Sequence, residues 1–263
     1  MNVIALSWWQ LGLAALLVLA LAACTHVARL GMSASLLVAA LRTVVQLALI
    51  GLVLEVLFAA KALHWVALMA FAMLLIAGRE VMVRQKRRLR GGWAFGIGTL
   101  SMFVSSFTVT VLALTVVIGP TPWYTPQYAI PLLGMLLGNT MTGVALALDR
   151  LTDTVWRQRA AIESRLMLGE PWQVAIADIR RDAIRSGLVP TINAMAAAGV
   201  VSLPGMMTGQ ILAGSAPALA VKYQILIMFA VTAGTGFGTL AAVMAGSRRL
   251  FDERERLRVD RLS

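Results

Sequence analysis

The stretch LLVAALRTVVQLALIGLVLEVLFA, residues 36–59, is apolar over its length except at Arg42, Thr43, Gln46 and Glu55. A helix needs about 20 mostly apolar residues to cross a hydrocarbon core of about 30 Å, so this stretch predicts a transmembrane helix. The whole chain has the same character, because 59% of its 263 residues are apolar and only 13% are charged. This composition lies outside the range of soluble domains and predicts an all-α, polytopic membrane bundle.

Charge clusters divide the chain into about seven spans of this kind. We predict them at residues 3–23, 36–59, 62–78, 93–119, 128–148, 188–203 with an irregular continuation to about 213, and 220–245. The chain is expected to form a single transmembrane domain over 1–263. It would carry a cytoplasmic segment at 149–187 and a basic cytoplasmic tail at 246–263.

Every second connection between the predicted spans is basic. The basic connections are REVMVRQKRRLR at 79–90, the segment 149–187 and the tail, whereas GPTPWYTPQY at 119–128 has no charge. The positive-inside rule therefore predicts an external N-terminus and a cytoplasmic C-terminus. The net charge of +11 is expected to face membrane lipid headgroups, and nothing in the basic segments favours nucleic acid.

The motifs of enzymes and nucleotide-binding proteins are missing from the sequence. It has no G-x-x-x-x-G-K-[ST] loop, no H-E-x-x-H pair, and a single cysteine, Cys24. The chain is therefore not expected to be an enzyme or to hold a cofactor, a disulfide or a cysteine-based zinc site.

The stretch VVSLPGMMTGQILAG, residues 200–214, interrupts a predicted span. A helix that reaches Leu203 meets Pro204, which has no backbone N–H, and Gly205, so we expect the helix to break there. An unwound backbone inside a membrane is tolerated where it lines a cavity, which makes Met206, Met207 and Gln210 candidates for the transport pathway. The two thioethers would suit a soft metal ion. The alternative is an external turn in which the methionines fill a gap.

Two polar groups inside other spans are further pathway candidates. Arg42 and Gln46 lie four positions apart on one helix face, although Arg42 is close enough to the predicted cytoplasmic end to extend into the headgroups. Asn139 and Met141 follow the G-x-x-x-G pair of Gly134 and Gly138. That pair favours close helix packing, with Asn139 hydrogen-bonding across the interface.

The cytoplasmic segment contains an amphipathic stretch that begins at Pro171. Trp172, Ile176 and Ile179 alternate with charged residues at helical spacing, so this stretch is expected to lie along the headgroup layer or in a groove of a cytoplasmic partner.

Glu163 and Gly169, six positions apart, resemble the motif by which permease subunits of ABC transporters dock into their ATPase. The match departs at Ser164 and Arg165, where the motif has alanines, and its closing proline comes late, at Pro190. The resemblance implies that Glu163, Gly169, Trp172 and Ile176 contact an ATPase.

A longer resemblance covers nearly the whole chain. Four segments resemble the FetB (YbbM) family of bacterial ABC-type membrane subunits and the related plant aluminium-resistance subunits: ALRTVVQLALIG, IPLLGMLLGNTMTGVALALDRL, IESRLMLG and VVSLPGMMTGQILAGSAPALAVKYQILIM. The resemblance implies an inner-membrane permease associated with iron export and resistance to oxidative stress. A separate FetA-like ATPase would hold ATP and magnesium.

Two such permease subunits are expected to pair, because seven spans are few for an ATP-driven transporter. The alternative is a self-sufficient secondary metal-ion transporter or channel, which would need intramembrane carboxylates or an inverted repeat. Glu55 is the only acidic residue within a predicted span, and no repeat is visible. A membrane scaffold that anchors a cytoplasmic protein is a third possibility.

Overall fold

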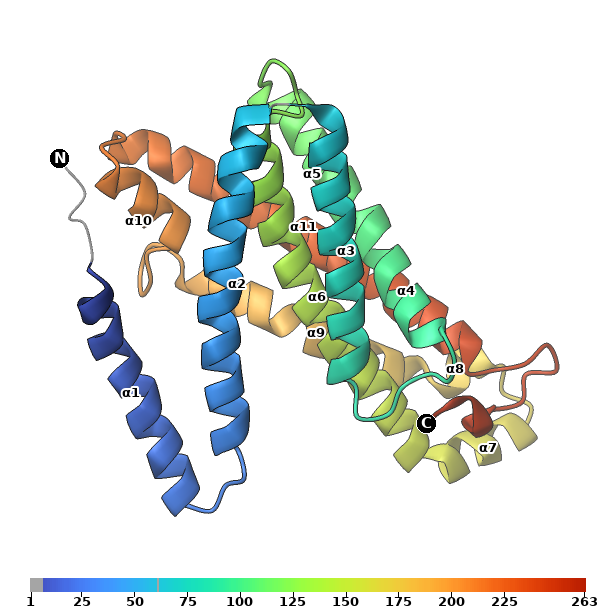
Figure 1. Ribbon diagram of the computed structural model, residues 1–263. Helices are drawn as coiled ribbons and strands as arrows, with labels where there is room; N and C mark the ends of the chain where they lie inside the picture. Colours follow the sequence, from blue (N-terminus) through green and yellow to red (C-terminus); the bar gives the residue numbers. More distant parts are fainter. Residues whose placement is uncertain (1–6, 61) are drawn as a thin grey trace. The chain divides into compact units, whose positions relative to one another are not determined.

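The computed structural model describes residues 7–60 and 62–263, which form helices and a few isolated backbone bridges but no β-strand. The chain divides into two compact units. The first comprises residues up to 62 together with 212–214, and the second comprises 63–211 and 215–263. The predicted all-helical membrane fold is confirmed (Figure 1).

The first unit is a helical hairpin. It consists of α1 (Trp8–Val27) and α2 (Ser33–Ala60), joined by a short turn in which Gly31 has a φ of +68°. Most of the large apolar side chains on both helices are exposed, as at Leu17 and Val38.

The second unit contains the remaining helices, except for Leu212, the last residue of α10. They are α3 (Leu63–Arg84), α4 (Trp93–Met102), the π-helical turn η1 (Phe103–Phe107), α5 (Thr108–Leu112), the second π-helical turn η2 (Ala113–Ile118), α6 (Pro126–Arg157), α7 (Arg159–Met167), α8 (Trp172–Ala175), α9 (Ala177–Ala197), α10 (Gly205–Leu212), α11 (Pro217–Arg249) and the 3-10 turn η3 (Val259–Arg261). The elements α4 to η2 follow one another without a gap and form one long helix.

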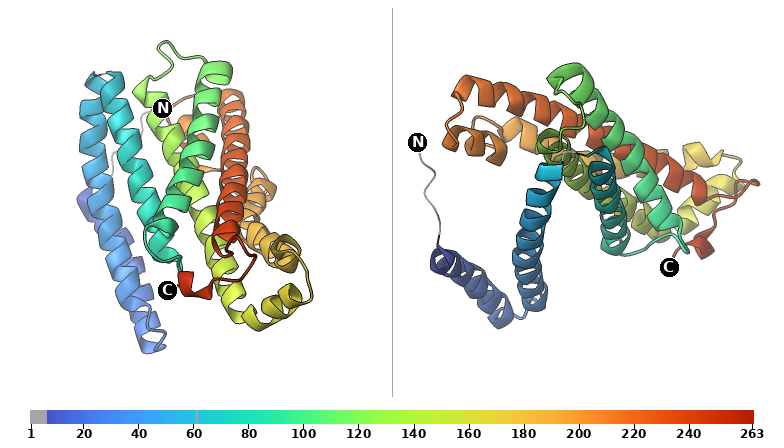
Figure 2. Two further views of the ribbon diagram at one scale, coloured as in Figure 1. Left: turned by 90° about the vertical axis from the view of Figure 1, so that its right-hand side faces the viewer. Right: turned by 45° about the horizontal axis from the view of Figure 1, so that its top comes forward.

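Helix α6 is the centre of the second unit and packs against α3, α9 and α11 (Figure 2). Its side chains Leu136, Val144, Ala147 and Leu151 are completely buried. Residues three and four apart on a helix share a face, so this apolar spacing explains why α6 is enclosed.

Three helices, α6, α9 and α11, approach one another closely where they cross. A Cβ atom added to Gly187 would lie 2.5 Å from the carbonyl oxygen of Gly143, and one added to Gly143 would lie 2.6 Å from Cγ2 of Thr235. The backbones can meet at this distance only because both positions lack a side chain.

The predicted close packing at the G-x-x-x-G pair of α6 is not found, whereas a glycine of α11 does pack closely. A Cβ atom on Gly238 would lie 2.5 Å from Cγ2 of Thr140, so Gly238 lets α11 approach α6. Gly138 faces open space, and a Cβ atom on Gly134 would meet only the end of Met73, at 3.1 Å. The spacing indicated a contact face, but the contacts of α6 fall one turn further on, at Gly143.

Six helical stretches within residues 7–60 and 62–263 are long and apolar enough to cross a membrane. They are 9–27, 33–58, 63–84, 93–118, 126–157 and 217–249, and each overlaps a predicted span. The seventh predicted span, 188–203, is not among them. Its residues belong to α9 and to the irregular segment that follows, and the first half of α9 carries charges such as Arg181 and Arg185.

The three basic segments meet at one end of the second unit. The backbone N–H of Lys86 donates to Asp149 at 2.7 Å, and that of Ser263 donates to the carbonyl oxygen of Arg88 at 2.9 Å. The backbone N–H of Trp172 donates to Glu255 at 3.2 Å. We call this the basic end. The opposite end of the second unit, with residues 119–125, 198–211 and 215–216, is called the far end. The prediction that these basic segments share one side is confirmed, and its assignment to the cytoplasm stays a prediction.

Candidate functional site

The break between α9 and α10 lies at the far end and begins earlier than predicted. Helix α9 ends at Ala197, and Gly199 follows with a φ of +82°. The carbonyl oxygen of Ala197 accepts backbone hydrogen bonds from Val201 at 3.0 Å and Ser202 at 3.1 Å, which satisfies a group that the helix end would leave free. The expectation that the helix reaches Leu203 is therefore wrong.

Pro204 starts the next helix instead of ending the previous one. Its carbonyl oxygen accepts the backbone N–H of Thr208 at 3.1 Å and the Thr208 hydroxyl at 2.8 Å. A proline is tolerated here because the first turn of a helix has no internal partner for its N–H groups. As a result, Pro204 fixes the start of α10 and the direction of its side chains.

Helix α10 forms one wall of a pocket of about 260 Å³ in the second unit. The other walls come from α6, from α11 and from the end of η2. The lining residues are Ile118, Gln127, Tyr128, Pro131, Leu132, Met135, Met206, Gln210, Ser215, Leu219, Tyr223 and Ile227.

The donor groups in this pocket are neutral. They are the thioethers of Met135 and Met206, the amides of Gln127 and Gln210, the phenols of Tyr128 and Tyr223 and the hydroxyl of Ser215, and no carboxylate lines the pocket. The residues that the structure describes contain no group of three or more His, Cys, Asp or Glu side chains that would hold a metal. A metal ion in this pocket would therefore meet sulfur, amide oxygen and phenol oxygen.

Gln210 has an unsatisfied acceptor at this site. Its Oε1 atom is buried and has no hydrogen-bond partner among the described residues. A buried acceptor left unpaired costs about 1–3 kcal/mol, so this wall of the pocket contains a polar group that its own chain does not satisfy.

The two adjacent methionines differ in position. Met206 lines the pocket, whereas Met207 does not line it and is buried, with 8% of its surface exposed. Neighbouring residues on a helix point about 100° apart, so the two sulfurs do not face one site. The sequence predicts Met206 and Met207 as a pair of ligands, but the pocket is lined by Met206 and by Met135 of α6.

Asn139 and Met141 lie outside the pocket. The Asn139 side chain is exposed, and its Nδ2 donates to the carbonyl oxygen of Met135 on the same helix at 2.8 Å. Met141 packs against the hydrophobic core. The expected hydrogen bond of Asn139 across a helix interface is therefore absent from the described residues of this chain.

Arg42 and Gln46 belong to the first unit, on α2, and both side chains are exposed. Their role in a pathway stays a prediction.

The predicted ATPase contacts lie at the basic end and differ in exposure. Glu163 is exposed on α7, and Gly169 ends that helix with a φ of +89°, a conformation that favours glycine. Met167 and Leu168 form the tip at the end of α7, and their exposed fractions are 81% and 85%. Exposed apolar side chains at a helix end are suited to contact a partner.

Trp172 and Ile176 face their own chain. Ile176 is completely buried in the core and Ile179 is 7% exposed, so the expectation that this apolar face lies on an outer surface is wrong for both. Trp172 is partly covered by the tail, because its ring stacks on Phe251 with 5.2 Å between centroids. The sequence indicated that the stretch from Trp172 to Ile179 has an apolar face. It did not indicate that the rest of the same chain covers this face.

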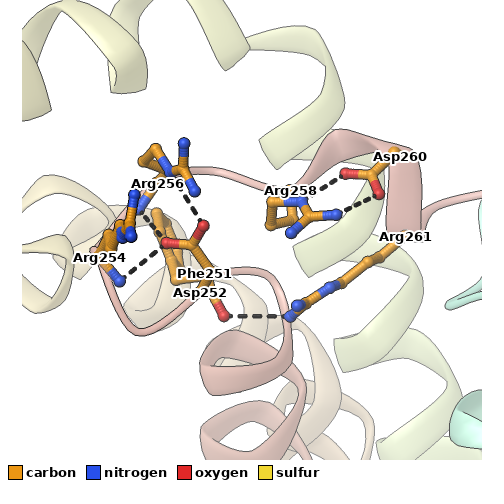
Figure 3. Close-up of polar contacts among 7 residues, drawn as sticks. All are labelled: Phe251, Asp252, Arg254, Arg256, Arg258, Asp260 and Arg261. Atoms are coloured by element: carbon orange, nitrogen blue, oxygen red, sulfur yellow. Dashed lines mark hydrogen bonds and ion pairs between the residues drawn. The ribbon is translucent and has the colours of Figure 1, made fainter.

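The tail is held by short-range polar contacts (Figure 3). Asp252 accepts the backbone N–H groups of Arg254 and Arg256 and forms an ion pair with the Arg256 guanidinium at 3.0 Å. The hydrogen bond from the Arg256 backbone is the main cause that keeps the pKa of Asp252 below its ordinary value. Likewise, the side-chain hydrogen bonds from Arg258 lower the pKa of Asp260. Both carboxylates therefore remain charged at neutral pH and fix the path of the tail.

Sequence reasoning missed the part of the pocket that comes from α6 and α11. Tyr128 and Met135 are seven residues apart and so lie on one face of α6, and Leu219, Tyr223 and Ile227 follow at intervals of four on α11. These periodicities were available in the sequence. Their meeting with α10 depends on the tertiary packing of three helices that the sequence does not pair.

These observations define the class of the protein: a helical, multi-pass membrane protein with a neutral pocket at one end and basic connections at the other. The chain belongs to the family UPF0014, described as an uncharacterised protein family, whose model matches residues 8–251.

Relatives of known name span most of the chain. The chain is 40% identical to the UPF0014 membrane protein slr1647 of Synechocystis sp., over 88% of each chain. It is 31% identical to the probable iron export permease protein FetB of Escherichia coli, over 96% of this chain and 95% of that protein. It is 34% identical to the UPF0014 membrane protein STAR2 of Oryza sativa, over 76% of this chain and 68% of that protein. No solved structure matches the chain.

Proposed function

We propose that this chain is the permease subunit of an ATP-driven transporter that exports iron or a related metal ion across the bacterial inner membrane. The full-length similarity to a relative named as a probable iron export permease supports this function. The apolar helices and the basic segments gathered at one end support a multi-pass protein of that membrane.

The observation that carries the proposal is the pocket at the far end, lined by the amide residue Gln210 and by the thioether residues Met135 and Met206. A transport site has to bind its ion firmly enough for entry and weakly enough for release. Neutral sulfur and amide ligands bind a divalent ion less strongly than carboxylates or thiolates would, because they add no charge. The donor set is therefore suited to an ion in transit.

The basic end supports a separate source of energy. The sequence contains no loop for nucleotide phosphates, whereas α7 presents the exposed carboxylate of Glu163 and the exposed apolar tip of Met167 and Leu168. A FetA-like ATPase that binds this surface would move α7, which follows α6 after a single residue. Helix α6 in turn forms a wall of the pocket.

The test is metal flux in sealed vesicles. The chain is reconstituted with its co-purified ATPase, and Fe²⁺ movement is followed with a fluorescent chelator after Mg-ATP is added. We expect flux only when both proteins and hydrolysable ATP are present, with an ATP analogue that cannot be hydrolysed as the control. Equal flux from the chain alone would show a self-sufficient transporter or channel and contradict the proposal.

A further inference from the structure

A groove follows the seam between the α4–η2 helix and α11 in the second unit. It consists of three adjoining hollows of about 630, 530 and 1110 Å³. Ser101 lines both the first and the second hollow, and Trp93, Ile97 and Ala245 line both the second and the third. The shared residues make the three hollows one continuous groove.

The first two hollows are apolar. Small residues of α11, among them Ala233, Ala241 and Ala245, leave room along the seam, and Leu100 and Phe237 are exposed at 64% and 62%. Ser105, which also lines the groove, donates its hydroxyl to the Ser101 carbonyl oxygen of its own helix at 2.8 Å. The groove therefore offers a mostly hydrocarbon surface in which the Ser105 hydroxyl is satisfied by its own helix.

The third hollow lies at the basic end and is rich in arginine. Five arginines line it against three acidic residues: Arg248, Arg249, Arg254, Arg256 and Arg261, with Asp252, Glu253 and Glu255. Two of the acids have partners within the chain, since Asp252 pairs with Arg256 and Glu255 accepts the backbone N–H of Trp172. The hollow therefore keeps an excess of positive charge and can attract an anion.

The join between the apolar and basic parts has the features of a membrane interface. Trp93 is 51% exposed at the start of α4, and the guanidinium of Arg249 lies 4.3 Å from its ring centroid. Tryptophan is enriched at the headgroup level, where its ring contacts both phases. From Gly92 to Ser101 the second hollow extends along nine helical steps, about 14 Å, which matches half of a hydrocarbon core of about 30 Å.

We propose that this groove binds one anionic phospholipid from the leaflet at the basic end. The lipid phosphate lies among the arginines of the third hollow, and an acyl chain lies along the α4–α11 seam. A second copy of the chain is a poorer occupant, because a symmetric contact would bring the same arginine-rich hollows together. The lipid anchors the tail, which packs on Trp172, and so stabilises the basic end.

The test measures lipid retention by the purified full-length chain. Native mass spectrometry compares dioleoyl phosphatidylglycerol with dioleoyl phosphatidylcholine at equal concentrations, with inorganic phosphate as a competitor. We expect the anionic lipid to be retained preferentially. The double variant Arg248→Gln and Arg254→Gln is expected to lower that retention about thirtyfold, since each of the two charges near an anionic headgroup contributes about 1 kcal/mol.

The matched control is Arg150→Gln with Arg185→Gln, which removes two exposed charges that do not line the groove. Its retention should equal that of the parent. Ala245→Phe, which fills the groove from an exposed position, should lower retention without changing the charge. Helical circular dichroism confirms that each variant is folded.

Three results would overturn the proposal. Equal retention of the two lipids would remove the preference for an anion. Complete displacement by inorganic phosphate would indicate a site for free phosphate. Rapid disulfide cross-linking of two copies that carry Ala245→Cys with Cys24→Ser would show that a second copy of the chain covers the groove.

Discussion

Met206 and Met207 show how one helical step separates two roles. Both sulfurs belong to α10, yet one lines the far-end pocket and the other is buried away from it. The chain turns after Ala197, and α10 then begins after Pro204. These two features determine which side chains of α10 face the pocket. The difference makes neighbouring residues into a matched pair for experiment.

Met206→Leu should reduce ATP-driven metal efflux roughly tenfold, because losing one ligand contact of about 1.4 kcal/mol changes affinity by that factor. Met207→Leu should leave efflux near the parental rate, since swaps of similar volume in a core usually cost less than about 1.5 kcal/mol. The measurement is initial flux at subsaturating metal, normalised to folded protein. Equal losses in both variants would show that the pocket wall does not distinguish the two residues.

At the scale of elements, the central crossing depends on two glycines that the sequence did not single out. Gly143 and Gly187 bring the backbones of α6 and α9 together beside Thr235 of α11. The more conspicuous G-x-x-x-G spacing of α6 ends at Gly138, which faces open space. A spacing motif shows that helices are able to approach, but the pairing partner decides where they do.

Gly187→Ala should destabilise the protein by about 1–3 kcal/mol, because its Cβ would press on the Gly143 carbonyl oxygen, which belongs to a fixed backbone. Gly138→Ala is the control. It adds the same methyl group to a helix where nothing lies within 4 Å, and it should be neutral or slightly stabilising. Thermal unfolding in detergent compares the two. A midpoint for Gly187→Ala equal to that of the parent would contradict the close crossing.

At the scale of the molecule, α9 and α10 lie where the sequence predicts one regular span. Thr232 of α11 donates to the sulfur of Met195 at 3.0 Å, and Gly187 lies against Thr239, so α9 runs antiparallel to α11. Helix α10 then reaches the start of α11 at the pocket. Helices α9 and α10 therefore extend from the basic end to the far end, and whether they cross the membrane as the predicted sixth span stays a prediction.

This arrangement predicts the accessibility of single cysteines in a Cys24→Ser background. Ser164→Cys, exposed on α7, should react with a membrane-impermeant maleimide only when the cytoplasmic side is open. Thr121→Cys, exposed at the far end, should react in intact cells. Labelling of both positions from the same side would contradict the odd number of crossings between them.

The sequence by itself determined the class of the protein. Long apolar stretches force a helical membrane fold, because an unpaired backbone is too costly in lipid, and clustered arginines mark one side. The residue string around 200–228 also indicated the family, which the comparisons confirm.

Only the tertiary structure decided which faces meet. It placed Met135, Tyr128 and Tyr223 beside Met206, buried Ile176 in the core, covered Trp172 with Phe251 and moved the close crossing to Gly143 and Gly187. The physical reason is that hydrophobic burial is non-directional. An apolar stripe indicates that a surface will be covered, whereas the chain segments that cover it are far away in the sequence and are chosen by packing.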